Sequence, residues 1–209
     1  MALSIGDSYG GGKVAYILVD GDPGYIDDGE QRGLIAATAN QSSGIQWTTD
    51  AYQDTAVPAP GATGEVLGTG LSNTNAIIAQ AGAGNTYAAG LARAYDGGGY
   101  DDWFLPSKDE LSKLYSSKVA VGGFQSEWYS SSTEDTSGLA YVVHFYNGNV
   151  GNYNKSGNLY VRCVRYFPSG LFTPSGPANL KSYNGLAKAS MKSIMGLGIA
   201  DIKSINGLA

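Results

Sequence analysis

Glycine interrupts this chain so often that long regular elements are not expected anywhere in it. The 209 residues include 31 glycines, tyrosine is also abundant, and only 15% of the residues are charged. Glycine favours tight turns because its backbone reaches conformations that other residues avoid. This composition favours a fold of short strands and turns over a helical bundle. The length suits one domain with a small appendage.

Short apolar runs predict where the first elements lie. A strand is predicted over 13–19 (KVAYILV), and two shorter strands over 33–38 and 45–47. Alanine, isoleucine and leucine at helical spacing predict short helices over 73–81 and 86–95. A third helix should begin at Ser107, because Ser107 and Glu110 stand three residues apart, as a capping box requires. Strands mixed with a few small helices indicate the α+β class.

After Tyr129 the pattern changes to strands separated by polar turns. Strands are predicted over 139–145 and 159–167, and Asn147-Gly148 is a hairpin signal. The stretch 169–179 is rich in proline and glycine, which is typical of a linker. The main domain should therefore span 1–168.

Residues 180–209 form an internal repeat. Its units begin at Leu180, Met191 and Ile202, so the period is 11 residues. One unit is too short to bury its own apolar face and needs neighbours from its own chain or from partner chains. An 11-residue period also fits a right-handed helical coil, but the glycine in each unit favours a β structure.

Charge and cysteine content exclude several kinds of partner. A net charge of −5 makes nucleic acid and anionic membranes poor partners. No run approaches the roughly 18 apolar residues of a membrane span, so no membrane insertion is expected. The N-terminal sequence lacks signal-peptide features, which predicts synthesis in a cytoplasm and release by lysis or within a particle. The single Cys163 cannot form an intramolecular disulfide and is expected to be a small, half-buried apolar residue.

The sequence offers little for catalysis or metal binding. Gly10-Gly11-Gly12-Lys13 is no phosphate loop, because Asp7 stands where the motif needs its first glycine. His144 is the only histidine, and no nucleophile-elbow sequence accompanies it. We therefore expect no enzyme, no cofactor and no metal. One acidic segment favours a solvated turn over a cation site, although a metal there stays an alternative: Asp20, Asp22, Asp27, Asp28 and Glu30.

The segment 141–160 (YVVHFYNGNVGNYNKSGNLY) has the composition of an antibody-like binding surface. Tyrosine supplies amphipathic contact area at a low entropy cost, and asparagine, serine and glycine adapt their hydrogen bonds. An ordinary tyrosine-rich strand surface would have the same composition. Both interpretations stay open on composition alone.

Residues 13–167 resemble a C-type-lectin-like domain of bacteria and phages that is related to the C-terminal domains of collagen-like bacterial adhesins. The resemblance is carried by the segments at 21–38, 44–47, 68–74, 87–111 and 161–167. It implies a C-type-lectin-like fold with short twisted antiparallel strands and two to three short helices. The sugar motif of calcium-dependent lectins is absent, and Cys163 stands where the related pattern usually has proline. Formylglycine-generating enzymes share the fold, but a lone cysteine cannot supply their two-cysteine chemistry.

Within that resemblance, the segment 139–165 looks like the variable region that diversity-generating retroelements rewrite at asparagine codons. Nine positions look rewritten, and each is encodable by changing the first two bases of AAC: Tyr141, Val142, His144, Tyr146, Gly151, Tyr153, Ser156, Gly157 and Leu159. Others look like scaffold: Ala140, Val143, Phe145, Gly148, Val150, Val161, Arg162, Val164 and Arg165. The ligand-binding set implied within 129–165 adds to the nine positions Tyr129, Ser131, Asp135, Ser137, Asn152, Asn154 and Asn158. The nine side chains are expected on one exposed face.

The resemblance implies a receptor-binding protein of a phage virion, in a tail or head fibre, that displays this variable surface to a host cell-surface receptor, either protein or glycan. The repeats at 180–209 are similar to short repeats of phage structural proteins. They imply attachment to other virion proteins or a homo-oligomer, with a trimer favoured over a monomer. The alternatives are a structural decoration or assembly protein of the virion, and a bacterial cell-surface adhesin.

Overall fold

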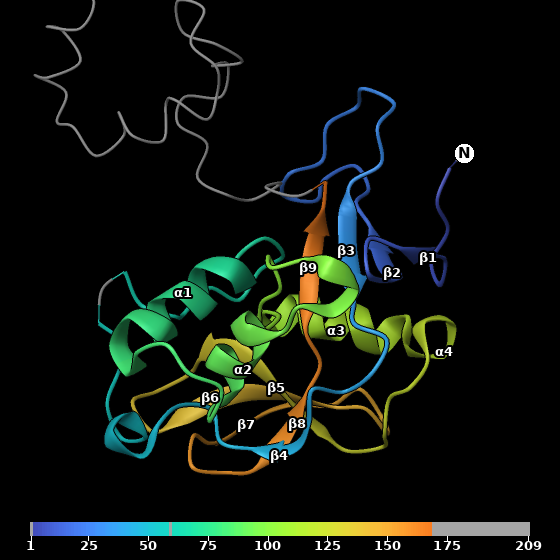
Figure 1. Cartoon of the computed structure of the whole chain (residues 1–209). Coiled ribbons are helices and arrows are strands. Elements are labelled where there is room, and N and C mark those ends of the chain that lie inside the picture. The colour runs from blue at the N-terminus through green and yellow to red at the C-terminus, as the bar shows by residue number, and fades with distance from the viewer. Residues whose placement is uncertain (1, 59, 169–209) are drawn as a thin grey trace, which may run out of the picture. The chain divides into compact units, whose positions relative to one another are not determined.

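The computed structural model describes residues 2–58 and 60–168 (Figure 1). The chain divides into two units, Met1–Thr173 and Pro174–Ala209. The predicted linker at 169–179 and the repeats at 180–209 lie outside the described residues, so what was predicted for them stays a prediction. Within the described part of the chain, no helix is long and apolar enough to cross a membrane.

One sheet joins the two ends of the first unit. It contains β1 (Ser8–Tyr9), β2 (Gly12–Ile17), β3 (Gly33–Ala36) and β9 (Val164–Phe167), in the order β1-β2-β3-β9 and antiparallel throughout. The predicted strands over 13–19 and 33–38 are confirmed as β2 and β3. Gly33 is required where β3 meets β2, because a Cβ there would lie 1.9 Å from the backbone oxygen of Tyr16.

A second sheet carries the predicted variable region. It contains β4 (Ser42–Ile45), β5 (Trp128–Glu134), β6 (Leu139–His144), β7 (Val150–Asn154) and β8 (Leu159–Val161), in the order β4-β8-β5-β6-β7. The hairpin signal at Asn147-Gly148 is confirmed, although the connection is the longer loop 145–149, closed by a hydrogen bond from the His144 N–H to the Asn149 carbonyl (2.9 Å).

Two predicted strand boundaries are wrong. The predicted strand at 159–167 is two strands in different sheets, β8 and β9, separated at Arg162-Cys163. The reason is that the guanidinium of Arg162 is buried and donates to the carbonyls of Ala37 (2.7 Å) and Gly123 (2.6 Å). The strand predicted at 45–47 lies earlier, at β4, because Trp47 turns inward and its indole N–H donates to the Ser131 carbonyl (2.8 Å).

Four α-helices complete the described part of the first unit, one more than the two to three expected. They are α1 (Gly70–Ala81), α2 (Ala88–Ala94), α3 (Lys108–Ser116) and α4 (Lys118–Val121), with 3-10 turns at Asp50–Tyr52 and Gly97–Gly99. The capping box at the start of α3 is confirmed. The Ser107 hydroxyl accepts from the Glu110 N–H (3.4 Å), and the Glu110 carboxylate accepts from the Ser107 N–H (2.8 Å).

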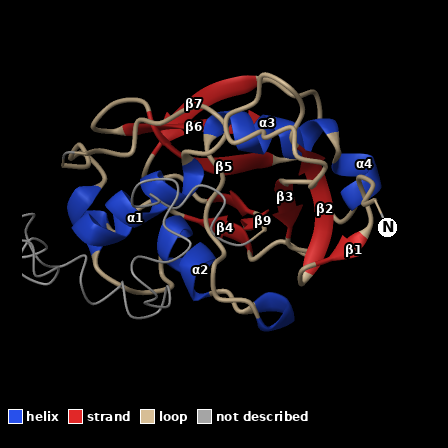
Figure 2. Cartoon of the chain, turned by 90° about the horizontal axis from the view of Figure 1, so that it is seen from above, coloured by secondary structure: helices blue, strands red, loops and turns tan. Residues whose placement is uncertain are grey.

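The helices lie on the side of the second sheet that also carries the first sheet (Figures 1 and 2). Apolar side chains from both sheets and from the helices form two buried clusters. One cluster contains Ile77, Trp103 and Val161, and the other contains Leu111 and Phe145. The α+β class is therefore confirmed, in an arrangement that agrees with the C-type-lectin-like fold implied by the resemblance.

Candidate recognition surface

The pairing of β6 with β7 divides the predicted variable positions between two faces of the sheet. The register is regular, with Tyr141 opposite Asn152, Val142 opposite Gly151 and Val143 opposite Val150. Successive side chains in a strand point to opposite faces. Tyr141 therefore lies on the face of the buried Val143, and His144 lies on the other face. The expectation that all nine side chains share one exposed face is wrong.

Aromatic residues cover the face that carries His144. The Trp128 and His144 rings are stacked, with their centroids 4.5 Å apart and their planes inclined by 22°. Tyr146 is 71% exposed, and its ring centroid lies 6.2 Å from that of His144. We call the following residues the aromatic face: Trp128, His144, Tyr146, Gly151 and Tyr153.

Trp128 reaches across the sheet. A Cβ built on Gly151 would lie 3.6 Å from the far edge of the Trp128 ring. Because β6 lies between β5 and β7, the indole must cross β6 to come this close to Gly151. Val142, which pairs with Gly151, is only 2% exposed. The prediction that Val142 is a surface contact is therefore wrong.

Tyr129 and Ser131 also lie below the surface, which corrects their assignment as ligand contacts. The Tyr129 ring packs on Phe145 with centroids 4.3 Å apart, and its hydroxyl donates to the Asn40 side chain (3.1 Å). Burial raises the pKa of Tyr129. The Ser131 hydroxyl donates to the carbonyl of Tyr141 (2.7 Å). Both residues are buried in the central strand β5, so they support the surface from beneath.

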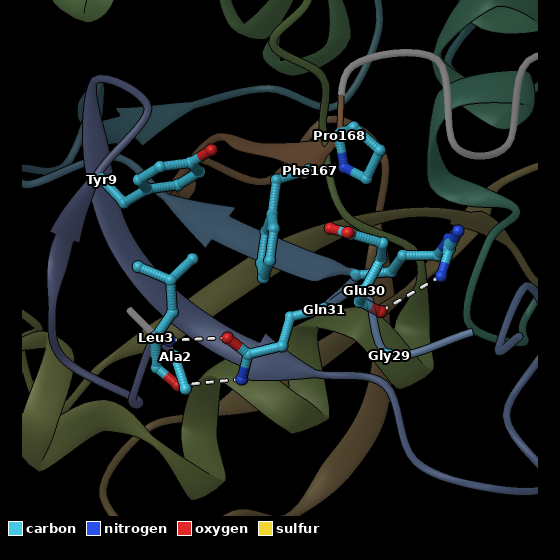
Figure 3. Close-up of a pocket in the computed structure, with 9 residues that line it drawn as sticks. Ala2, Leu3, Tyr9, Gly29, Glu30, Gln31, Phe167 and Pro168 are labelled. Carbon is cyan, nitrogen blue, oxygen red and sulfur yellow. Dashed lines mark hydrogen bonds between the residues drawn. The ribbon is translucent and has the colours of Figure 1, made fainter. Parts of the chain in front are cut away.

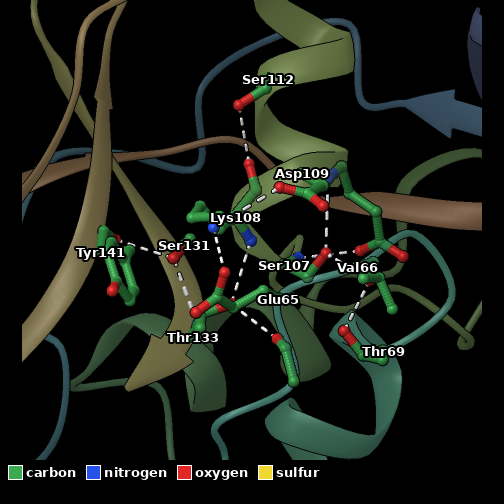
Figure 4. Close-up of polar contacts among 12 residues, drawn as sticks. Glu65, Val66, Thr69, Ser107, Lys108, Asp109, Ser112, Ser131, Thr133 and Tyr141 are labelled. Atoms are coloured by element: carbon green, nitrogen blue, oxygen red, sulfur yellow. Dashed lines mark hydrogen bonds and ion pairs between the residues drawn. The ribbon is translucent and has the colours of Figure 1, made fainter. Parts of the chain in front are cut away.

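A polar cluster lies on the face opposite His144, and Figure 4 shows three of its residues, Glu65, Lys108 and Tyr141. We define it by Glu65, Lys108, Asp135, Tyr141 and Asn152. The Lys108 ammonium pairs with Glu65 and lies 5.1 Å from the centre of the Tyr141 ring. Asn152 donates to the Asp135 carboxylate (2.8 Å), and a hydrogen bond to the same carboxylate raises the pKa of Tyr141. Three predicted site residues, Asp135, Tyr141 and Asn152, are thus brought together here.

The other predicted site residues lie in the turns around β7. Ser137, Asn154, Ser156 and Asn158 are exposed, and Leu159 is half-buried opposite Ile45 in β4. Gly157 lies under Tyr153, because a Cβ on Gly157 would come within 2.3 Å of the Tyr153 ring. Any side chain at position 157 must therefore displace Tyr153.

A buried lysine that sequence reasoning missed holds these turns. The Lys155 ammonium donates to the Glu134 carboxylate (2.6 Å) and to the carbonyls of Ser137 (2.7 Å) and Thr55 (3.0 Å). The same carboxylate accepts from the Val57 N–H (3.0 Å). A lysine among asparagines and serines gives no sign of burial in the sequence. Lys155 joins the β7–β8 turn to the 55–57 segment.

The four scaffold residues that were expected to be buried are buried, whereas the scaffold residue Val150 is 49% exposed. Val143, Phe145, Val161 and Val164 are at most 1% exposed. Close packing makes substitution in such positions costly. The aromatic face therefore rests on a rigid apolar layer.

The remaining candidate sites have structural partners. Asp28 forms a bidentate pair with Arg32 (2.7 Å for each contact), and this pair lowers the pKa of Asp28 to about 2. Across residues 2–58 and 60–168, no group of three or more histidine, cysteine, aspartate or glutamate side chains is placed to hold a metal ion. Cys163 is fully buried rather than half-buried, and burial raises the pKa of its thiol.

A cavity of about 560 Å³ lies beside β1 and the end of β9 (Figure 3). Its lining includes Leu3, Tyr9, Gln31, Phe167 and Pro168. The Gln31 amide accepts from the Leu3 N–H (2.6 Å) and donates to the Leu3 carbonyl (3.0 Å), so its polar atoms are already engaged. None of the predicted site residues lines this cavity.

Comparison with known proteins places the chain in a family. No curated protein matches the sequence. Residues 36–165 match the Lcl C-terminal domain, a segment that begins in β3, ends in β9 and contains the whole aromatic face. The match covers more than half of the chain. The chain therefore belongs to the Lcl C-terminal domain family.

Proposed function

We propose that this chain is a receptor-binding adhesion protein of a phage particle and that its aromatic face contacts a receptor on the host cell surface. One observation carries the proposal. The aromatic face presents the exposed Tyr146 and Tyr153 and the half-buried Trp128 above a buried layer that includes Val143 and Phe145. Exposed aromatic side chains on a rigid support are typical of binding surfaces, because they bury much area at a low entropy cost. Membership of the Lcl C-terminal domain family supports an adhesin-like character.

The geometry also supports diversification of the exposed positions. A Cβ at Gly151 would meet the Trp128 ring at an ordinary contact distance of 3.6 Å, so larger residues fit there. His144 and Tyr146 project from the β6–β7 hairpin without filling the core. In this proposal a diversity-generating retroelement rewrites Tyr141, His144, Tyr146, Gly151, Tyr153, Ser156, Gly157 and Leu159.

The proposed activity is binding alone. The His144 ring contacts Trp128 and the side-chain oxygen of Asn147 (3.2 Å), and neither is a nucleophile or an acid that a catalytic relay would use. Weak single contacts would become firm attachment if several copies were displayed together. We assign that display to the repeats at 180–209, with a trimer as the favoured assembly.

Binding of the full-length protein to a panel of bacterial strains tests the proposal. The aromatic variant His144→Ser/Tyr146→Ser/Tyr153→Ser is compared with the control Val19→Ser/Ile26→Ser/Val119→Ser, which removes three exposed apolar residues elsewhere. The aromatic variant should lose at least about tenfold in affinity, as expected for removal of interface anchors, and the control should bind like the parent. A variant that binds cells normally but fails to enter particles would show an assembly role instead.

Sequencing the gene across a phage population tests diversification. Substitutions should concentrate at the eight positions above and spare Val143, Phe145, Val161 and Val164. A reverse transcriptase and an asparagine-rich template repeat should lie near the gene. Substitutions spread evenly over 139–165 would contradict this part of the proposal.

A further inference from the structure

Trp128 stands in the middle of the aromatic face, yet it precedes the segment 139–165 that resembles a variable region. Its ring stacks on His144 of the neighbouring strand β6. It also reaches Gly151 of β7, on the far side of β6. Changing the first two bases of AAC cannot produce tryptophan. In the proposed diversification Trp128 would therefore stay constant between two rewritten positions, 144 and 151.

We infer that Trp128 is a fixed aromatic anchor for a protein ligand and that residue 151 determines how much of the anchor the ligand reaches. The inference rests on the proposed function and names a contact within the same surface. A tryptophan half open to solvent and held by its neighbours is the kind of residue that dominates protein interfaces, because it desolvates a large area without losing much freedom.

The surroundings of the ring favour an apolar group of a protein as its ligand. The strand positions around the ring on this face are Trp128, Ser130, Val142, His144 and Gly151, and Glu134, which pairs with Ala140 farther along β5, is buried with Lys155. None of the positions around the ring carries aspartate, glutamate, lysine or arginine. A charged ligand group would lose its hydration here without gaining a partner. An apolar or aromatic side chain of a protein epitope suits the site, and the tyrosine-rich composition of the segment is that of a protein-binding surface.

Gly151 leaves the far edge of the Trp128 ring uncovered on the β7 side. A Cβ at position 151 would lie 3.6 Å and 3.7 Å from two carbons of that edge, so substitution needs no movement of the backbone. The atoms beyond the Cβ would then extend along or over the indole. A large residue at position 151 would thus cover the Trp128 ring, whereas glycine leaves the ring accessible to a ligand.

Fluorescence quenching tests the geometry without any ligand. The chain has three tryptophans, and Trp47 (3% exposed) and Trp103 (0%) are buried, so acrylamide should quench chiefly Trp128. Trp128→Phe should abolish the accessible component. Gly151→Tyr should reduce it about twofold, because a second ring covers the indole. The control Asn152→Tyr adds the same ring to the opposite face and should leave quenching unchanged. Equal quenching in Gly151→Tyr and the parent would overturn the role of residue 151.

Selection for binding tests the anchor. The full chain is displayed as a library randomised at His144, Tyr146, Gly151 and Tyr153, and binders are selected on a purified folded protein such as lysozyme. In each binder, Trp128→Ala should weaken affinity at least about tenfold, as for a hot-spot residue. Trp128→Phe should weaken it less, and the remote Val119→Ser should have no effect.

The outcomes separate this inference from the proposed function. Binders that keep their affinity in both Trp128 variants would overturn the anchor and leave the recognition surface intact. Failure to recover any binder from the library would overturn both. If Trp128→Ala fails to fold, Trp128→Phe decides the question, because it keeps an aromatic ring beside His144. Binders enriched in large residues at position 151 would contradict the idea that glycine there gives the ligand access to the Trp128 ring.

Discussion

Lys155 and Glu134 form an ion pair of 2.6 Å between side chains that are 0% and 5% exposed. The pair lies between the β5–β6 connection and the β7–β8 turn, and it also binds the Thr55 carbonyl and the Val57 N–H. It therefore holds the turns that carry Ser137 and Ser156 to the rest of the domain. A buried charge is stabilised only while its partner and its hydrogen bonds are present.

Replacing Lys155 by methionine should destabilise the protein strongly. The change leaves the Glu134 carboxylate buried and unpaired, and removal of one partner of such a pair costs about 3–5 kcal/mol. Urea unfolding of the full-length protein measures the loss. The double variant Lys155→Met/Glu134→Gln should be less destabilised than Lys155→Met alone, because no unpaired charge remains. A Lys155→Met protein as stable as the parent would contradict the structural role.

Arg162→Lys should be destabilising although the charge is kept. The guanidinium donates to the Ala37 and Gly123 carbonyls and to the Asn40 side chain (2.9 Å), and it lies 4.0 Å from the centre of the Phe124 ring. Burial lowers the pKa of Arg162 to about 10. An ammonium cannot reproduce this planar set of contacts, so thermal unfolding should show a loss of about 1–3 kcal/mol.

Arg32→Lys provides the control for this prediction. Arg32 is partly buried and pairs with Asp28, whose side chain is 40% exposed, and an ion pair this close to solvent contributes less to stability than a fully buried set of contacts. Its effect on thermal unfolding should be much smaller than that of Arg162→Lys. Equal effects of the two substitutions would show that the buried contacts of Arg162 contribute no more to the free energy of unfolding than those of Arg32.

The elements with strong local signals could be predicted from the sequence. Ser107 and Glu110 marked the start of α3 because a capping box depends only on residues three apart. The β-branched run at 13–19 and the apolar run at 139–145 predicted β2 and β6, because these signals also depend only on residues close in sequence. The break between β8 and β9 escaped prediction, because Arg162 is drawn inward by carbonyls from segments about 40 and 125 residues away.

The candidate surface was only partly predictable. Composition identified the exposed Tyr146 and Tyr153, but it could not assign faces, which depend on the register of β6 with β7. Trp128 was missed because its importance comes from stacking on His144 and reaching Gly151 across two strand spacings. Lys155 was missed because its partners come from the separate segments at Thr55, Glu134 and Ser137.

Two glycines in the same hairpin should respond differently to alanine. Gly148 has a φ of +79°, and a Cβ there would lie 2.4 Å from the Tyr115 ring. Gly151 has no positive φ, and its Cβ would make only ordinary contacts. Gly148→Ala should lower the free energy of unfolding by about 1–3 kcal/mol, whereas Gly151→Ala should change it by less than about 0.5 kcal/mol. Urea unfolding of both variants measures the difference, and equal stabilities would contradict the assignment of Gly148 to the scaffold.

The last prediction concerns the repeats at 180–209, which lie outside the described residues. Each unit has three apolar residues at matching positions, such as Leu180, Tyr183 and Leu186 in the first unit, and too little chain to bury them alone. Removing residues 169–209 should therefore leave a soluble, cooperatively unfolding monomer, because the apolar clusters of the first unit are formed by residues before 168.

The intact chain should in contrast run as an oligomer in sizing experiments or be incorporated into particles. Gel filtration with light scattering compares the two forms. A control chain in which Leu180, Met191 and Ile202 are each replaced by serine keeps the full length and should behave like the truncated protein, since it loses one apolar residue from every unit. If the truncated protein were as oligomeric as the intact chain, the association would reside in the first unit, and the multivalent display proposed for the aromatic face would have to be built from that unit instead.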